Sequence, residues 1–138
     1  MIVNIEHSEF EDVLSYVTSL RILRHLDMDR TIMRRVFTSC INHGFAVKVL
    51  NKDKEIVGCM FAQLGQNQWG ATVTKELLSY ATEQTPQLLR AYSKWGEKNK
   101  VSLLSVSNSL GGERYEKLIQ ALGFTTKTTT FVKEINHG

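Results

Sequence analysis

The side chains best suited to chemistry in this sequence do not form a familiar catalytic or metal-binding motif. None of the four histidines stands with an acid and a nucleophile in the pattern of a catalytic triad. The two cysteines, Cys40 and Cys59, have neither a CxxC partner nor a histidine at metal-ligand spacing. We therefore expect buried free thiols and no metal site. The histidines are His7, His25, His43 and His137.

Five arginines form a basic cluster around the start of the second predicted helix. A nucleic-acid surface would need interleaved aromatic side chains or a known module, and the sequence has neither, so nucleic acid is not an expected partner. A solvated face and a contact with an acidic protein partner, made through Arg30, Arg34 and Arg35, both explain the cluster. The arginines are Arg21, Arg24, Arg30, Arg34 and Arg35.

Length and composition predict an ordinary soluble protein. With 138 residues, 42% of them hydrophobic and 22% charged, the chain should form one domain over residues 1–138. No apolar run approaches the ~20 residues that cross a bilayer. The acidic start has no signal-peptide pattern, and free cysteines favour a reducing compartment, so we expect a cytoplasmic protein. The net charge of +3 favours anionic partners, nucleic acid and coenzyme A alike.

Hydrophobic periodicity predicts the elements of the first half. Alternation over residues 1–5 indicates a strand, and Ser8 with Glu11 fits a capping box before an amphipathic helix. A second helix spans residues 29–43, after which Gly44 should take the left-handed conformation. Residues 45–51 and 55–64 predict an antiparallel hairpin. A turn at 65–67 leads to a strand at 68–75, and residues 76–85 either end that strand or begin a helical turn.

The second half predicts two further helix–strand units. Pro86 at a first helical position, with Thr85 as N-cap, starts a helix over residues 86–100. A buried strand at 101–107 follows, and then a helix at 113–122 with apolar residues at helical spacing. After Gly123 and Phe124, the Thr-rich residues 125–131 predict a final strand, whose edge could pair with a second copy in a homodimer.

This order resembles the GCN5-related N-acetyltransferase (GNAT) superfamily. The similar residues are Leu88 to Ala91 with Trp95, the strand at 102–107 with Asn108, Tyr115 to Leu118, and Gly123 with Phe124. The resemblance implies an α/β (α+β) fold with a mixed, mostly antiparallel central sheet and helices on both faces, in the order β-α-α-β-β-β-α-β-α-β. It implies acetyl-CoA as the cofactor and direct acetyl transfer, in a ternary complex, to a small-molecule or protein amine that the sequence does not name.

The resemblance also implies where acetyl-CoA would bind. The family holds the pyrophosphate on a loop of pattern Gln/Arg-x-x-Gly-x-Gly/Ala before the third helix, where glycines and free N–H groups allow close approach. Tyr80, Glu83 and Thr85 occupy the pattern positions here and depart from it. Glu83 would oppose a diphosphate by about 1 kcal/mol in a screened setting. The implied cofactor contacts are Val73, Thr74, Gln84, Thr85, Gln87, Arg90 and Asn108.

The catalytic residues implied by the resemblance are Tyr115 and Glu76. The family's tyrosine, which protonates the leaving thiolate, stands seven residues after an asparagine, and Asn108 and Tyr115 have that separation. Tyr115 could instead be a core aromatic, and Ile119 lies on the same helix face. Glu76 is the best-placed base, with a solvated loop charge as the alternative. His25 falls in the substrate-binding region of the family, and a surface residue is its alternative.

Two functions follow from the resemblance. One is an acetyl-CoA-dependent N-acetyltransferase. The other is a non-catalytic binding protein of the same fold, because the sequence looks like the small, divergent branch encoded by bacteriophages. Assembly and virion proteins share the fold in that branch, so the location would be the cytoplasm of a bacterial host or a virion.

Overall fold

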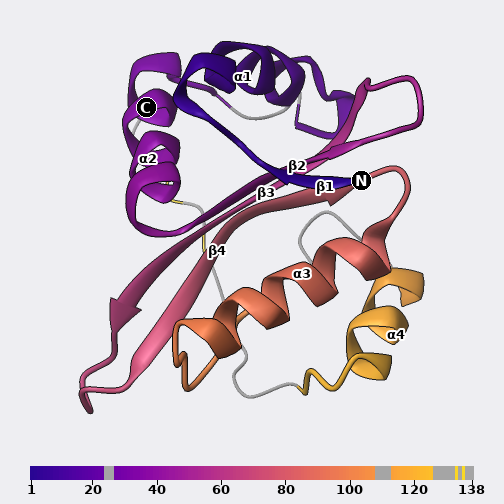
Figure 1. Ribbon diagram of the computed structural model, residues 1–138. Coiled ribbons are helices and arrows are strands. Elements are labelled where there is room, and N and C mark those ends of the chain that lie inside the picture. The colour runs from indigo at the N-terminus through magenta and orange to yellow at the C-terminus, as the bar shows by residue number, and fades with distance from the viewer. Residues whose placement is uncertain (24–26, 108–112, 126–132, 134, 136–138) are drawn as a thin grey trace.

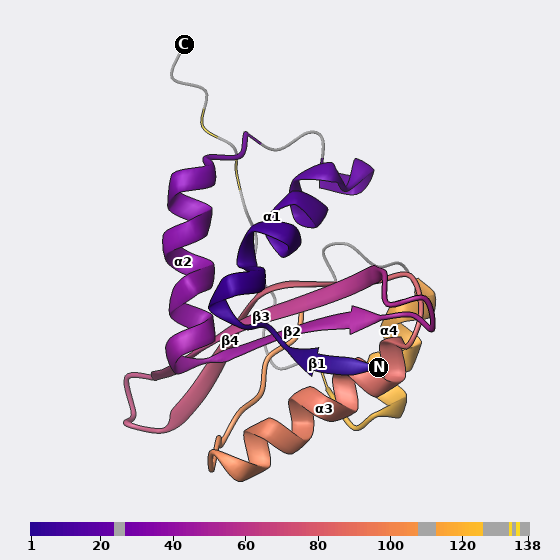
Figure 2. The ribbon, with the colours of Figure 1, turned by 45° about the horizontal axis from the view of Figure 1, so that its top comes forward.

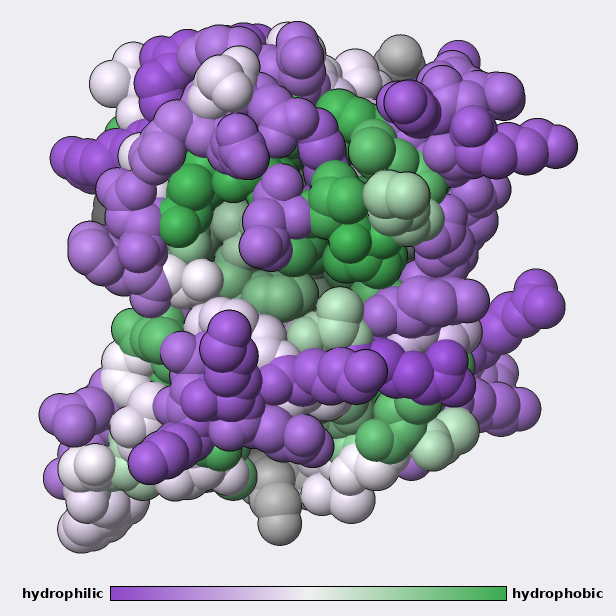
Figure 3. All heavy atoms as spheres, viewed as in Figure 1, coloured by the Kyte–Doolittle hydropathy of each residue, from purple (hydrophilic) through white to green (hydrophobic). Residues whose placement is uncertain are grey.

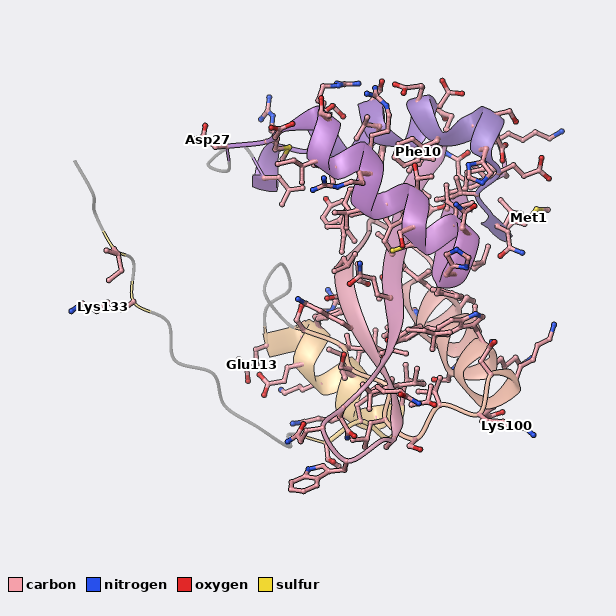
Figure 4. The ribbon with its side chains drawn as sticks, turned by 90° about the vertical axis from the view of Figure 1, so that its left-hand side faces the viewer. Met1, Phe10, Asp27, Lys100, Glu113 and Lys133 are labelled. Carbon is pink, nitrogen blue, oxygen red and sulfur yellow. The ribbon has the colours of Figure 1, made fainter. Side chains whose placement is uncertain are left out.

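The computed structural model describes residues 1–23, 27–107, 113–125, 133 and 135. Its sheet contains β1 (Ile2–Asn4), β2 (Phe45–Leu50), β3 (Ile56–Gln66) and β4 (Thr72–Ala81), in that order and with antiparallel neighbours. The helices α1 (Phe10–Ser19) and α2 (Arg30–His43) cover one face. The helices α3 (Thr85–Lys98) and α4 (Glu113–Ala121) lie on the other face (Figures 1 and 4). The predicted mixed fold with helices on both faces is therefore confirmed.

The sheet separates two apolar cores. Alternate residues of β2 and β3 point to opposite faces, so Ala46 and Phe61 pack under α1 and α2, whereas Val47 and Met60 pack under α3. In the space-filling view, an apolar band lies between the α1–α2 layer and the sheet, with hydrophilic surface above and below it (Figure 3). The described residues include no helix that is long and apolar enough to cross a membrane.

The sequence predicted the start of α2 correctly but not the start of α1. The predicted capping box at Ser8 and Glu11 is wrong: a short 3₁₀ helix, η1 (His7–Glu9), precedes α1, and the Glu9 carboxylate accepts from the Glu6 N–H at 3.1 Å. For α2 the sequence-based start is confirmed, because Asp29 caps it by accepting from the N–H groups of Thr31 and Ile32. A second 3₁₀ helix, η2 (Arg21–Leu23), follows α1.

Gly44, which follows α2, is not left-handed as predicted. Its φ of −144° lies outside the left-handed region. The position instead requires glycine because a Cβ there would stand 2.3 Å from the carbonyl oxygen of Ala62 on β3. The close approach of the α2 terminus to the sheet explains this residue.

The β3–β4 hairpin is longer than predicted. β3 continues to Gln66, and the turn lies at residues 67–70, where the Asn67 side chain accepts from the N–H groups of Trp69 and Ala71, each at 3.0 Å. Gly70 supplies the positive φ, +81°, that ends the turn. β4 then runs to Ala81, so the ambiguous residues 76–81 are strand.

The segment after α3 forms less strand than predicted. Residues 101–107 pass beside β4 in a parallel direction, but among the described residues their pairing is a single bridge between Leu103 and Val73 (Figure 2). The predicted α4 is confirmed, and Gly123 follows it with a φ of +96°. The predicted final strand at 125–131 lies outside the described residues apart from Thr125.

Candidate active site

A β-bulge in β4 organises the candidate site. Phe61 of β3 pairs with Leu78 and Ala62 pairs with Glu76, so Leu77 is an extra residue between two regular pairs. Leu77 and Leu78 both pack against the core under α1 and α2. Glu76 and Ser79 therefore both lie on the face toward α3 and α4, opposite Ala62 and Met60.

Glu76 is held beside the end of residues 101–107. The Ser107 hydroxyl donates a hydrogen bond of 2.9 Å to the Glu76 Oε2. Burial raises the pKa of the Glu76 carboxyl above its ordinary value, and the Ser107 hydroxyl and backbone N–H oppose that rise. The carboxyl is thus partly withdrawn from water while the donors of Ser107 stabilise its charged form, which suits a group that accepts a proton near neutral pH.

Tyr115, on the first turns of α4, lies near Glu76. Its hydroxyl is buried and makes no well-formed hydrogen bond within the part of the chain that the structure describes. Burial raises the pKa of the Tyr115 hydroxyl, the nearby Ser79 hydroxyl lowers it, and the negative charge of Glu76 raises it again. The structure therefore brings Tyr115 of α4 close to Glu76 and Ser79, which lie on one face of β4. A buried hydroxyl without a good partner is costly and marks a functional candidate.

A second hydroxyl cluster lies around Thr74, two residues before Glu76 in β4. Thr74 is buried, its Oγ1 is 2.5 Å from the hydroxyl of Tyr92 on α3, and the Tyr92 hydroxyl donates to the Ser105 carbonyl oxygen at 2.9 Å. Burial raises the pKa of Tyr92 to about 12, so its hydroxyl stays protonated at any physiological pH. The predicted cofactor residue Thr74 thus has its hydroxyl engaged inside the protein. Its neighbour Val73 forms the bridge to Leu103.

The loop before α3 is organised by Gln84. Gln84 is the N-cap position of α3, with a left-handed φ of +62°, so the prediction of Thr85 as N-cap is wrong and Thr85 is the first helical residue. The Gln84 side chain accepts from the Met1 amino group and donates to the Leu50 carbonyl oxygen at 3.0 Å. These contacts occupy the amide that was predicted to bind the cofactor.

The other predicted cofactor contacts are spread along this end of α3. Gln87 and Arg90 are exposed on α3, and Glu83 is exposed in the loop. Tyr80 is not in the loop, because it lies in β4 opposite Cys59. Asn108 falls outside the described residues.

The arginine cluster is partly used to join α1 to α2. Arg34 forms an ion pair of 2.8 Å with Glu11, and Arg30 approaches the same carboxylate at 3.9 Å. Arg35 is exposed, whereas Arg24 and His25 lie outside the described residues. No group of three or more potential metal ligands occurs in the described ranges.

Sequence reasoning missed three contributors to the site, which are Ser79, Tyr92 and Ser107. Tyr92 has the spacing of an ordinary core aromatic, so only its hydroxyl contacts reveal it. The serines gave no signal, because their role depends on the bulge at Leu77 and on the place where residues 101–107 leave the sheet.

Comparison with known proteins supports the fold. No protein-family model matches the sequence, and no curated protein matches it. A Trypanosoma brucei acetyltransferase structure is similar, with a TM-score of 0.71 at 10% identity over 98% of this chain and 99% of that one. A ribosomal-protein-alanine N-acetyltransferase from Brucella melitensis biovar Abortus 2308 gives 0.72 at 13% identity over 98% and 99%. An aminoglycoside antibiotic 6′-N-acetyltransferase from Acinetobacter baumannii gives 0.65 at 14% identity over 100% and 99%.

These neighbours share the architecture across nearly their whole length. The chain therefore has the GNAT-like acetyltransferase fold, as its sequence order indicated. At such identities the similarity extends to the fold and not to the chemistry.

Proposed function

We propose that the chain is an acetyl-CoA-dependent N-acetyltransferase that acts on an amine by direct transfer in a ternary complex. The observation that carries this proposal is the closeness of two half-buried groups, the carboxyl of Glu76 on β4 and the hydroxyl of Tyr115 on α4. Both groups have raised pKa values, and the transfer needs one group that accepts a proton and one that donates a proton.

The residues around the bulge fit the thioester end of acetyl-CoA. The extra residue Leu77 leaves the regular β3–β4 ladder, so its backbone N–H is a candidate donor to the carbonyl oxygen of the thioester. The Tyr115 hydroxyl, which makes no well-formed hydrogen bond within the described residues, is a second candidate donor near Glu76. Acetyl-CoA supplies the activated acetyl group, and Leu77 and Tyr115 would hold it.

Three proton movements follow from these positions. Glu76, directly or through a water, removes a proton from the substrate ammonium so that the amine nitrogen can form the new bond to carbon. Tyr115 gives its proton to the sulfur as the carbon–sulfur bond breaks, and the nitrogen of the new amide loses its second proton to the tyrosinate, directly or through a water, so that Tyr115 is protonated again. Its raised pKa keeps Tyr115 protonated until the carbon–sulfur bond breaks, and the raised pKa of Glu76 makes the carboxylate a stronger base.

The diphosphate end fits less well than the thioester end. The first turn of α3 has backbone N–H groups without helical acceptors, which suit a phosphate, but Pro86 lacks one of them. Glu83 adds a negative charge, whereas Arg90 and Gln87 are exposed donors on the same helix. We propose that Thr85, Gln87 and Arg90 hold the phosphates, and that Gln84 positions the loop instead of touching them.

Calorimetric titration with acetyl-CoA tests the proposal. We expect micromolar binding, and no heat at millimolar ligand would refute it. In a transfer assay with a panel of amines, Glu76→Gln should lower kcat by about 10²- to 10⁴-fold, because a general base is lost. Tyr115→Phe should lower kcat with little change in affinity. If Tyr115→Phe loses affinity alone, Tyr115 is a binding residue and not the acid.

The loop before α3 favours a second candidate function. Glu83, Pro86 and the occupied side chain of Gln84 make a poor phosphate site, which suits a non-catalytic binding protein of the same fold. Such a protein would use the exposed Arg35 and its neighbours against an acidic partner, although Arg34 is already paired with Glu11. The same titration decides between the two candidates.

A further inference from the structure

The contact between β4 and residues 101–107 begins at the single parallel bridge between Val73 and Leu103. The Ser102 N–H donates to the Thr72 carbonyl oxygen at 2.8 Å, and the Thr74 N–H donates to the Leu103 carbonyl oxygen at 3.1 Å. In a regular parallel ladder, every second residue of one strand bonds to the two residues that flank its partner on the other strand. After Leu103, the next such residue is Ser105. The Thr74 carbonyl oxygen should therefore accept from the Ser105 N–H.

Side-chain hydroxyls replace that bond. The Ser105 N–H donates to the Thr74 Oγ1 at 3.0 Å, and the Ser105 Oγ donates to the Thr74 carbonyl oxygen at 2.8 Å. Both backbone groups are satisfied, but through inserted oxygen atoms. An inserted oxygen requires more room than a direct N–H to carbonyl contact, so the two backbones separate here.

The next ladder bond is replaced as well. In a continuing ladder, the Ser105 carbonyl oxygen would accept from the Glu76 N–H. It accepts from the Tyr92 hydroxyl at 2.9 Å instead. Tyr92 is fully buried on α3, and the Thr74 Oγ1 that donates to it fixes its hydroxyl from the other side. Two residues later, the Ser107 hydroxyl and N–H donate to the Glu76 carboxylate.

We propose that the hydroxyl triad Thr74, Tyr92 and Ser105 holds residues 105–107 away from β4 and so creates the opening in which Glu76 and Ser107 meet. This inference rests on the proposed function in so far as the opening admits the thioester. Tyr92 is then a positioning residue: it touches no reacting atom, and it acts by occupying the Ser105 carbonyl oxygen.

The triad makes the opening an intrinsic property of the protein. Partly buried backbone N–H and carbonyl groups gain from having partners, and two neighbouring strand edges without other partners would otherwise pair with each other. The three hydroxyls supply those partners from within, so the opening needs no ligand to keep it. Removing them should let the ladder continue from Leu103 to Ser107.

The experiment compares the wild type with the double variant Thr74→Val, Tyr92→Phe, in which both side chains keep their shape. In isotope-labelled protein we expect a new nuclear Overhauser contact between the Glu76 amide proton and the α-protons of Ser105 and Val106. Calorimetry should show acetyl-CoA binding weakened by about tenfold or more, the size of one lost positioning contact.

Tyr16→Phe is the matched control, because the Tyr16 hydroxyl is also buried and has no partner within the described residues. It should leave both readouts unchanged. If the double variant does not fold, Ser105→Ala removes one bond of the triad and should give a weaker form of the same contact. A folded variant without the new contact overturns the proposal. If the contact forms and the wild type does not bind acetyl-CoA, the opening is explained and the proposed function alone fails.

Discussion

The chemistry of Glu76 is decided by the few groups around it. Burial favours its neutral form, and the donors of Ser107 favour its charged form, so its pKa is raised only as far as those donors permit. The same charge raises the pKa values of Tyr92 and Tyr115, which ties the three groups into one electrostatic unit. A change at any of them should therefore be visible in the titration of the others.

Ser107→Ala should move the titration of Glu76 to higher pH. The variant loses the 2.9 Å donor that opposes the effect of burial, so the pKa of the carboxyl rises further. In the proposed mechanism Glu76 must be ionised to accept a proton, so the acid limb of the pH profile of kcat/KM should shift to higher pH with the pKa of Glu76.

The variant should also change how stability depends on pH. A carboxyl whose pKa is higher in the folded state binds more protons there, so stability falls as pH rises from the unfolded pKa through the folded one. In Ser107→Ala this fall should extend to higher pH. Carbon-13 titration of the Glu76 side chain and urea denaturation across pH check both statements, and an unshifted carboxyl would show that Ser107 does not tune it.

Only part of this site was available from the sequence. Glu76 and Tyr115 were predicted as site residues through the resemblance, and the side of β4 on which Glu76 lies depends on the bulge at Leu77, which no local pattern predicts. Thr74 was assigned to the cofactor, yet its hydroxyl bonds Tyr92 and Ser105. The partner of a hydroxyl is a tertiary fact, and residue type alone does not contain it.

Helices and strands were more predictable than the places where they meet. Periodicity indicated the four α-helices that the structure describes, because an amphipathic stripe is a property of one segment, but it did not indicate the short 3₁₀ helices η1 and η2. It misplaced the β3–β4 turn by a few residues, since Asn67 starts the turn with its side chain while Gly65 looked like the turn residue. It also predicted a full strand at 101–107 from Leu103, Leu104 and Val106. These apolar residues carry no sign of the hydroxyl contacts that replace the backbone bonds after the bridge at Leu103.

Gly44→Ala should destabilise the joint between α2 and the sheet. The new Cβ would stand 2.3 Å from the Ala62 carbonyl oxygen, a backbone atom that moves only with β3. We expect a loss of about 1–3 kcal/mol in the free energy of unfolding, the usual cost of overpacking. Gly65→Ala, where a Cβ meets nothing within 4 Å, should stay within about 0.5 kcal/mol. Equal losses in urea denaturation would contradict this account.

Across the whole molecule, one ion pair joins the first helical segment to the centre of the sheet. Lys48 of β2 is only 9% exposed, and its Nζ lies 2.5 Å from the Oε2 of the partly exposed Glu9. The Lys48 side-chain contact is the main reason why the pKa of Glu9 is lowered. Removing the charge of Glu9 leaves the buried charge of Lys48 without a partner, whereas replacing Lys48 by an apolar residue leaves no buried charge.

The two halves of this pair should therefore respond unequally to mutation. Glu9→Gln should lower the free energy of unfolding by about 1–2 kcal/mol after allowance for the exposure of Glu9, and Lys48→Met should be close to neutral. In the wild type, the stability due to Glu9 is present above its unfolded pKa and lost as pH falls through the lowered folded pKa. Urea denaturation of both variants at neutral and acidic pH measures the asymmetry. A larger loss for Lys48→Met at neutral pH would contradict it.

The bulge at Leu77 has a genetic consequence. Without that residue, Glu76 would be followed directly by Leu78, the pairs Ala62–Glu76 and Phe61–Leu78 would remain, and β4 would alternate regularly. Deleting one codon would thus keep the register of the whole sheet while removing the backbone donor proposed to meet the thioester. A lineage that abandons the proposed acetyl transfer and retains the scaffold has this single deletion open to it, whereas the proposed chemistry requires that β4 keep its extra residue.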